Sequence, residues 1–104
     1  MDRRGVLFLL FDLPGKTKEQ CREYAKFRKD LKRNGYIGIQ ESVYVRLFHN
    51  SSNITAEKFR LKSVVPKEGS VFVLNLSLKN FKNLTAILGK DFDFELFSGD
   101  VIYV

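Results

Sequence analysis

A continuous apolar run at residues 6–11 constrains the fold of this chain more than any other segment. The run ends at Asp12 and is followed by the turn sequence Leu13-Pro14-Gly15, so it predicts a buried central strand. Successive side chains of a strand point to opposite faces of the sheet, and both faces are apolar here. The sheet therefore needs a cover on each side.

The remaining segments predict the element order β-α-β-β-α-β. Thr17 stands three residues before Gln20, a capping-box spacing that opens a helix running to Asn34-Gly35. Two strands are expected in residues 36–48, a helix at 54–65, a strand at 71–78, a short helix at 81–88 and extended pieces at 94–97 and 101–104. This order indicates an α+β protein with a ferredoxin-like βαββαβ fold and a C-terminal extra strand, forming a single domain over residues 1–104.

The sheet face that carries Asp12 can be covered in two ways. In a ferredoxin-like fold both helices pack on the other face. The same sheet of a second, twofold-related copy would cover the open face, giving a sheet-to-sheet homodimer with both Asp12 residues near the interface. Alternatively, the segment after residue 80 folds back over this face. The apolar residues 101–104 are expected to add as an edge strand to this subunit or its partner.

The charged residues are distributed unevenly along the chain. All 18 Lys and Arg lie within residues 1–90, whereas residues 91–104 form an acidic appendage without a base, and the formal net charge is +6. A basic body of this density favours a polyanion such as nucleic acid, the alternative being a basic protein without a specific partner.

No segment indicates secretion or a membrane span. The run at residues 6–11 is too short for either, so we expect a cytoplasmic protein without membrane contact. Cys21 is the only cysteine, which excludes an intrachain disulfide, and its place on the apolar side of the first helix predicts a buried, inert thiol.

A row of basic residues follows the first helix within an arc of about 80°: Lys18, Arg22, Lys26, Lys29 and Arg33. Such a row can contact successive phosphates of duplex DNA. The alternative is ion pairing within the helix, because three acids stand three residues before three of these bases: Glu19, Glu23 and Asp30. Five bases against three acids favour phosphate contact. Arg28 projects instead into the apolar arc, where it either extends to solvent or meets an acidic or backbone partner.

Asp12 is the best single candidate for catalysis or metal binding. It lies where a buried strand ends and a Pro-Gly turn begins, so its carboxylate can be held rigidly and still reach solvent. Mg²⁺ takes about one or two carboxylates together with water and substrate phosphate, which a pair of Asp12 residues across a twofold could supply. Alternatively, Asp12 holds the turn through hydrogen bonds to the backbone. One histidine, His49, gives little support to a zinc site or a Ser-His-Asp arrangement.

Three segments resemble the CRISPR-associated protein 2 family, in the form found with type II systems: FDLP at 11–14, REYAKFRKDLKRNGY at 22–36 and QESVYVRL at 40–47. The resemblance implies a prokaryotic, ferredoxin-like homodimer that acts in spacer acquisition. In that role it bridges two dimers of the CRISPR integrase and presents basic side chains to the duplex DNA of the prespacer. Other type II adaptation proteins are implied as further partners.

The same resemblance implies a second activity. Family members are described as metal-dependent endonucleases acting on RNA or duplex DNA, and their metal ligand, which would hold Mg²⁺ or Mn²⁺, matches Asp12. Other family residues match Arg22, Arg28, Arg33, Ser42 and Tyr44. A non-catalytic DNA-binding scaffold is our leading hypothesis, an Asp12-dependent endonuclease is the alternative, and a stand-alone toxin-like ribonuclease is a third hypothesis.

Overall fold

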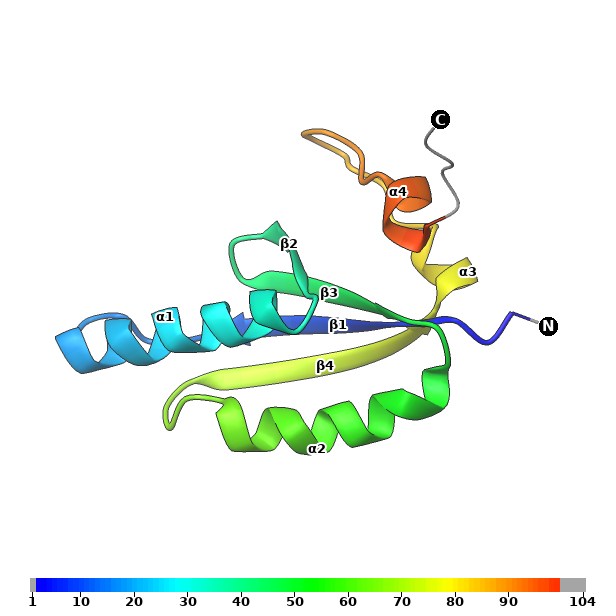
Figure 1. Ribbon diagram of the computed structural model, residues 1–104. Coiled ribbons are helices and arrows are strands. Elements are labelled where there is room, and N and C mark those ends of the chain that lie inside the picture. Colours follow the sequence, from blue (N-terminus) through cyan, green and yellow to red (C-terminus); the bar gives the residue numbers. More distant parts are fainter. Residues whose placement is uncertain (1, 100–104) are drawn as a thin grey trace.

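The computed structural model describes residues 2–99 and contains one antiparallel four-stranded sheet (Figure 1). Its elements are β1 (Gly5–Asp12), α1 (Lys18–Arg33), β2 (Ile37–Gln40), β3 (Val43–Phe48), the 3₁₀-helix η1 (Ser51–Asn53), α2 (Ile54–Val64), β4 (Ser70–Ser77), α3 (Leu78–Phe81) and α4 (Phe94–Ser98). The strand order β2-β3-β1-β4 places β1 in the interior of the sheet. The predicted α+β class and ferredoxin-like βαββαβ order are confirmed.

Helix α1 begins where the capping box predicts. The Gln20 backbone N–H donates to the Thr17 hydroxyl at 3.0 Å, and the Thr17 N–H donates to the Gln20 side-chain oxygen at 3.1 Å. Two otherwise unpaired donors of the first turn are thereby satisfied, which fixes the start of the helix.

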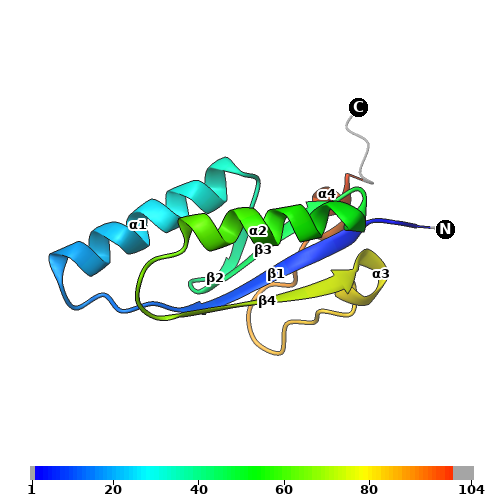
Figure 2. The same cartoon turned by 90° about the horizontal axis from the view of Figure 1, so that it is seen from below.

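Helices α1 and α2 cover the same face of the sheet (Figures 1 and 2). The core between these layers comprises Leu7, Leu9 and Phe11 of β1, Phe27 and Leu31 of α1, Ile54 and Leu61 of α2, and Tyr36, Tyr44 and Phe48. Burying one side chain of this size stabilises the fold by about 1.5–3 kcal/mol, so this core holds α1 firmly against the sheet.

The opposite face of the sheet is covered only at one end. Val6, Val45, Leu78 and Phe81 are buried there, and Phe92, Phe94 and Phe97 pack against them. The segment after β4 therefore folds back over the sheet, as in the second of the two predicted covers, and stands above the end near the N-terminus (Figure 1). At the Asp12 end the face stays open.

Three large apolar side chains remain exposed on this open end. Leu10 is 38% exposed, Phe72 70% and Leu74 50%. Leu10 lies opposite Phe72 in the β1–β4 ladder and Phe8 lies opposite Leu74, so these residues share one face of the sheet. The expected open apolar surface is thus present at the Asp12 end of the sheet.

Two predictions for the C-terminal part are wrong. The helix expected at 81–88 does not form; a single helical turn, α3, lies before it at Leu78–Phe81 and is capped by the Ser77 hydroxyl, which accepts a hydrogen bond from the Asn80 N–H at 3.1 Å. The piece expected to be extended at 94–97 is helix α4, because the Asp93 carboxylate accepts from the Leu96 N–H at 2.9 Å and caps it. The predicted strand at 101–104 lies outside the described residues.

The apolar arc of α1 is narrower than predicted. Phe27 and Leu31 are buried, but Ala25 and Cys21 are exposed, and the Cys21 thiol lies 3.2 Å from the Gly15 carbonyl oxygen. A helix that lies on a sheet buries only the arc that faces it, and both residues lie outside that arc. Within residues 2–99, no helix combines the length and hydropathy needed to cross a lipid bilayer.

Candidate nucleic-acid interface

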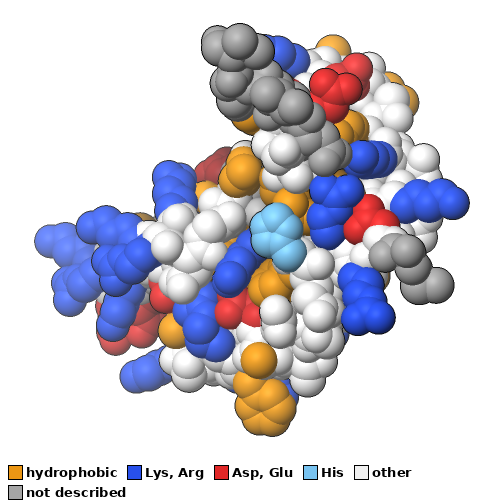
Figure 3. All heavy atoms as spheres, turned by 45° about the vertical axis from the view of Figure 1, so that its right-hand side comes forward, with side chains coloured by type: hydrophobic (Ala, Val, Ile, Leu, Met, Phe, Trp, Pro, Cys, Tyr) orange, Lys and Arg blue, Asp and Glu red, His pale blue; other side chains and the backbone are white. Residues whose placement is uncertain are grey.

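The five predicted DNA-binding residues form one exposed surface on α1, here called the basic face: Lys18, Arg22, Lys26, Lys29 and Arg33. On the helical wheel the basic face lies opposite Phe27 and Leu31, which point into the core. In Figure 3, Lys and Arg side chains gather on the left of the molecule, where α1 lies. Lys32, which was not predicted to bind DNA, is also exposed and lies about 40° from Lys18 on the wheel.

The acids of α1 form no ion pair with the basic face in the part of the chain that the structure describes. Asp30 forms an ion pair with Arg60 of α2, with 2.9 Å between Oδ2 and Nη1, instead of the predicted pair with Arg33. Within residues 2–99, no ion pair includes a member of the basic face. The predicted alternative, pairing within the helix, is therefore wrong: Asp30 pairs with Arg60 of α2, and Glu23 lines the cleft between α1 and α2 without an ion pair among the described residues.

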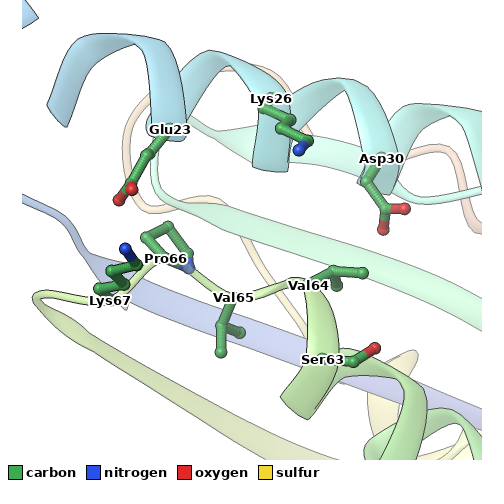
Figure 4. A pocket seen from close by; sticks show the side chains of 8 residues that line it. All are labelled: Glu23, Lys26, Asp30, Ser63, Val64, Val65, Pro66 and Lys67. Atoms are coloured by element: carbon green, nitrogen blue, oxygen red, sulfur yellow. The ribbon is translucent and has the colours of Figure 1, made fainter. Parts of the chain in front are cut away.

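A cleft of about 270 Å³ separates α1 from the end of α2. Its charged lining consists of Glu23, Lys26, Asp30 and Lys67, and the carboxylates of Glu23 and Asp30 point from α1 into the gap (Figure 4). Two acids and two lysines leave this cleft without net charge, so it offers little attraction to a polyanion. Lys26 stands at the edge of the basic face and also lines the cleft, whereas the other four members do not. Binding of a phosphate backbone is thus favoured on the outer side of α1.

Arg28 and Tyr44 lie beside each other but apart from the basic face. The Arg28 Nε donates to the Tyr44 hydroxyl at 3.3 Å, and the guanidinium lies 5.7 Å from the centre of the Tyr24 ring. The hydrogen bond to Tyr44 raises the pKa of Arg28. Arg28 thus meets a phenol, which was not among the predicted alternatives of solvent, an acid or a backbone group.

The ring of Tyr44 is held between two strands. It stacks on Phe11 of β1 at 5.6 Å between ring centres. On its other side lies Gly38 of β2, where a Cβ atom would come within 3.2 Å of the ring. Ser42 is half-buried, and its carbonyl accepts a hydrogen bond from the Phe11 N–H at 3.0 Å. Residues matched to the family's SVY run thus build the sheet, and the role of Gly38 was not foreseen.

A buried carboxylate, Glu57, connects α2 to the sheet. It accepts hydrogen bonds from the Tyr36 hydroxyl at 2.6 Å, from Arg60 Nε at 2.7 Å and from Arg46 Nη1 at 3.3 Å. Burial raises the pKa of Glu57, but the hydrogen bonds from Arg60 and Tyr36 outweigh it and hold this pKa below its usual value. Burial, reinforced by Glu57, raises the pKa of Tyr36 far above its usual range. No local sequence pattern predicts this network.

Asp12 lies at the end of β1 on the open face of the sheet, and it is exposed. Within residues 2–99 its carboxylate accepts no hydrogen bond, so the alternative in which Asp12 holds the turn finds no contact to support it. The backbone at Gly69 passes close to the backbone of Asp12. The φ of Gly69 is 103°, and a Cβ there would lie 2.6 Å from the Asp12 carbonyl oxygen. This close approach requires glycine.

One subunit does not contain a complete metal site around Asp12. No group of three or more His, Cys, Asp or Glu side chains in residues 2–99 could hold a metal ion. Asp12 by itself does not fit Mg²⁺ or Mn²⁺, which need further oxygen ligands. Helix α1 packs on one face of the sheet (Figure 2), whereas Asp12 ends β1 on the opposite, open face.

Comparison with known proteins agrees with this fold. Residues 6–88 match the model of the family described as CRISPR associated protein Cas2. A solved structure described as "Crystal structure of cas2" superposes with a TM-score of 0.58 over 85% of this chain and 90% of that chain. Its sequence identity is 19%, so this likeness concerns the fold alone.

Curated relatives are similar in sequence as well. A protein of Ligilactobacillus salivarius (strain UCC118) named CRISPR-associated endoribonuclease Cas2 is 42% identical over 84 residues, which cover 81% of this chain and 83% of that protein. A protein of the same name from Streptococcus mutans serotype c (strain NN2025) is 39% identical over 84 residues, which cover 81% of this chain and 78% of that protein. On the family match and these identities, the chain belongs to the CRISPR-associated Cas2 family.

Proposed function

We propose that this Cas2 family member is a homodimeric scaffold of CRISPR spacer acquisition that bridges dimers of the integrase and binds the prespacer duplex along its backbone. The observation that carries the proposal is the basic face, five exposed cations on one side of α1 without an ion pair among residues 2–99. Contacts to phosphates position a protein on DNA without reading its sequence. Such contacts suit a scaffold that must accept prespacers of differing sequence.

The open end of the sheet supports the homodimer. Leu10, Phe72 and Leu74 form an exposed apolar surface that a second copy of the same surface would bury. Because the segment after β4 occupies the other end of this face, the partner sheet can approach only at the Asp12 end. A twofold axis there would bring the two Asp12 residues close together and would supply a second basic face.

Duplex binding by the wild-type protein tests the proposal. If the five side chains of one basic face each contact a phosphate, the logarithm of the association constant should fall with the logarithm of salt concentration with a slope of about −4 to −5. Fluorescence anisotropy with two duplexes of equal length and unrelated sequence measures this slope, and the two affinities should agree within about twofold. Absent or salt-independent binding, or failure to co-purify with the integrase, would contradict the scaffold.

A second candidate function is metal-dependent endonuclease activity through Asp12. It is favoured by the exposed Asp12 carboxylate beside the open apolar surface and by the names of the curated relatives, which are endoribonucleases. Two Asp12 carboxylates related by the dimer axis, together with a substrate phosphate, would provide oxygen ligands for Mg²⁺ or Mn²⁺.

Asp12→Ala separates the two functions. If the endonuclease candidate holds, cleavage of RNA or duplex DNA in the presence of Mg²⁺ or Mn²⁺ should fall to background, while duplex affinity stays within about twofold because Asp12 is not a member of the basic face. Phe72→Asp places a charge in the proposed dimer surface and should abolish cleavage with Asp12 intact. Cleavage that continues in purified Asp12→Ala protein would exclude Asp12 as the metal ligand.

A further inference from the structure

We infer that Arg60 is a positioning residue for DNA binding: it holds the Asp30 carboxylate on the α2 side of α1 and so keeps it from neutralising the basic face. The inference rests on the proposed function of the basic face. Arg60 itself belongs to α2 and is not a member of that face.

The guanidinium of Arg60 bridges two carboxylates. One edge binds Glu57, with 2.7 Å from Nε to Oε1 and 3.0 Å from Nη2 to Oε2. The remaining nitrogen, Nη1, donates to both oxygens of Asp30, at 2.9 Å and 3.2 Å. The planar fork of arginine allows this double contact, which the single ammonium of lysine cannot reproduce.

Glu57 fixes the orientation of Arg60 from the interior. The Glu57 side chain is only 6% exposed, whereas those of Arg60 and Asp30 are 31% and 23% exposed. Glu57 is held in turn by the hydroxyl of Tyr36, at 2.6 Å. The buried end of the network therefore directs the free edge of Arg60 towards α1.

Besides Arg60, the Asp30 carboxylate accepts a long hydrogen bond from Asn34 Nδ2, at 3.4 Å. Without Arg60, Asp30 would therefore be free to meet the cations of its own helix. It stands three residues before Arg33 and four after Lys26, the spacings at which helical side chains meet. Either of these cations, once paired with Asp30, would have to give up that pair before it could bind a phosphate. In water the attraction between two opposite charges about 4 Å apart changes an equilibrium constant by a factor of about five. We therefore expect a loss of duplex affinity of this size.

Arg60→Lys tests the inference without changing the net charge. The lysine is expected to stay with the buried Glu57 and release Asp30, so duplex affinity should fall about fivefold and the salt slope should become shallower by about one. In the background of Asp30→Asn, which removes the competing charge, Arg60→Lys should change the affinity by less than about twofold. A purely structural role of Arg60 would not produce this rescue.

The other outcomes overturn the inference. An Arg60→Lys protein that binds like the wild type would show that Asp30 does not compete. An equal loss of duplex affinity with and without Asp30→Asn would show that Arg60 itself contacts DNA or only supports the fold. Arg60→Met, measured alone and together with Asp30→Asn, repeats the test with a second variant. Melting temperatures of all variants report on folding. If the wild-type protein failed to bind duplex at all, the proposed function would fail instead.

Discussion

Replacement of Arg22, Lys26 and Arg33 by glutamate is expected to weaken duplex DNA binding at least about 100-fold at physiological salt. Three phosphate contacts are lost, and three negative charges are placed beside the phosphate backbone. The salt slope should become shallower by about three, because about 0.9 counterion is released for each phosphate contact. Fluorescence anisotropy over a series of salt concentrations measures both quantities.

A matched variant distinguishes the basic face from overall charge. Arg3, Lys79 and Lys90 are exposed and lie outside α1, and their replacement by glutamate also lowers the formal net charge from +6 to zero. If the basic face binds DNA, this control should lose less than about tenfold in affinity and keep its salt slope. Equal losses in the two triple variants would show that binding depends on net charge and not on the surface of α1.

Glu57→Ala is expected to destabilise the protein by about 3 kcal/mol, near the lower end of what removing one partner of a buried ion pair costs, because Arg46 and Arg60 are partly exposed. The Tyr36 hydroxyl would also lose its hydrogen-bond acceptor. For a domain of this size, the loss corresponds to a fall in melting temperature of about 10–20 °C. Thermal unfolding followed by circular dichroism measures it. Glu41→Ala removes an exposed acid and should change stability by less than about 0.5 kcal/mol.

The contribution of Glu57 should depend on pH with a defined sign. The pKa of Glu57 is about 4.3 in the unfolded chain and lower in the folded protein. The folded state therefore favours the carboxylate. The stabilisation is fully present above that unfolded pKa and is lost as the pH falls through the folded pKa. The difference in free energy of unfolding between wild type and Glu57→Gln should therefore be constant near neutral pH and shrink in acid. A difference that grew in acid would contradict the lowered pKa.

Local spacing along the chain was enough to predict much of this protein. The capping box at Thr17 and Gln20 placed the start of α1, and the apolar run at residues 6–11 placed β1, because both signals involve neighbours within one helical turn or one strand. The basic face followed from the 3.6-residue period alone. The exposure of Cys21 and the helix at Phe94–Ser98 were mispredicted, since they depend on how much of α1 the sheet covers and on the capping of a short segment by Asp93.

The βαββαβ order, the central strand and the side of α1 on which the cations lie could all be predicted from local patterns in the chain. Which acid pairs with which base depends instead on how the layers pack. Asp30 is three residues from Arg33 but pairs with Arg60, 30 residues away, because the buried Glu57 orients that guanidinium. The tertiary structure likewise put the phenylalanines of the segment after β4 over one end of the sheet and left the Asp12 end open. Contacts between distant segments depend on how the helices pack on the sheet, and local periodicity in the sequence does not indicate that packing.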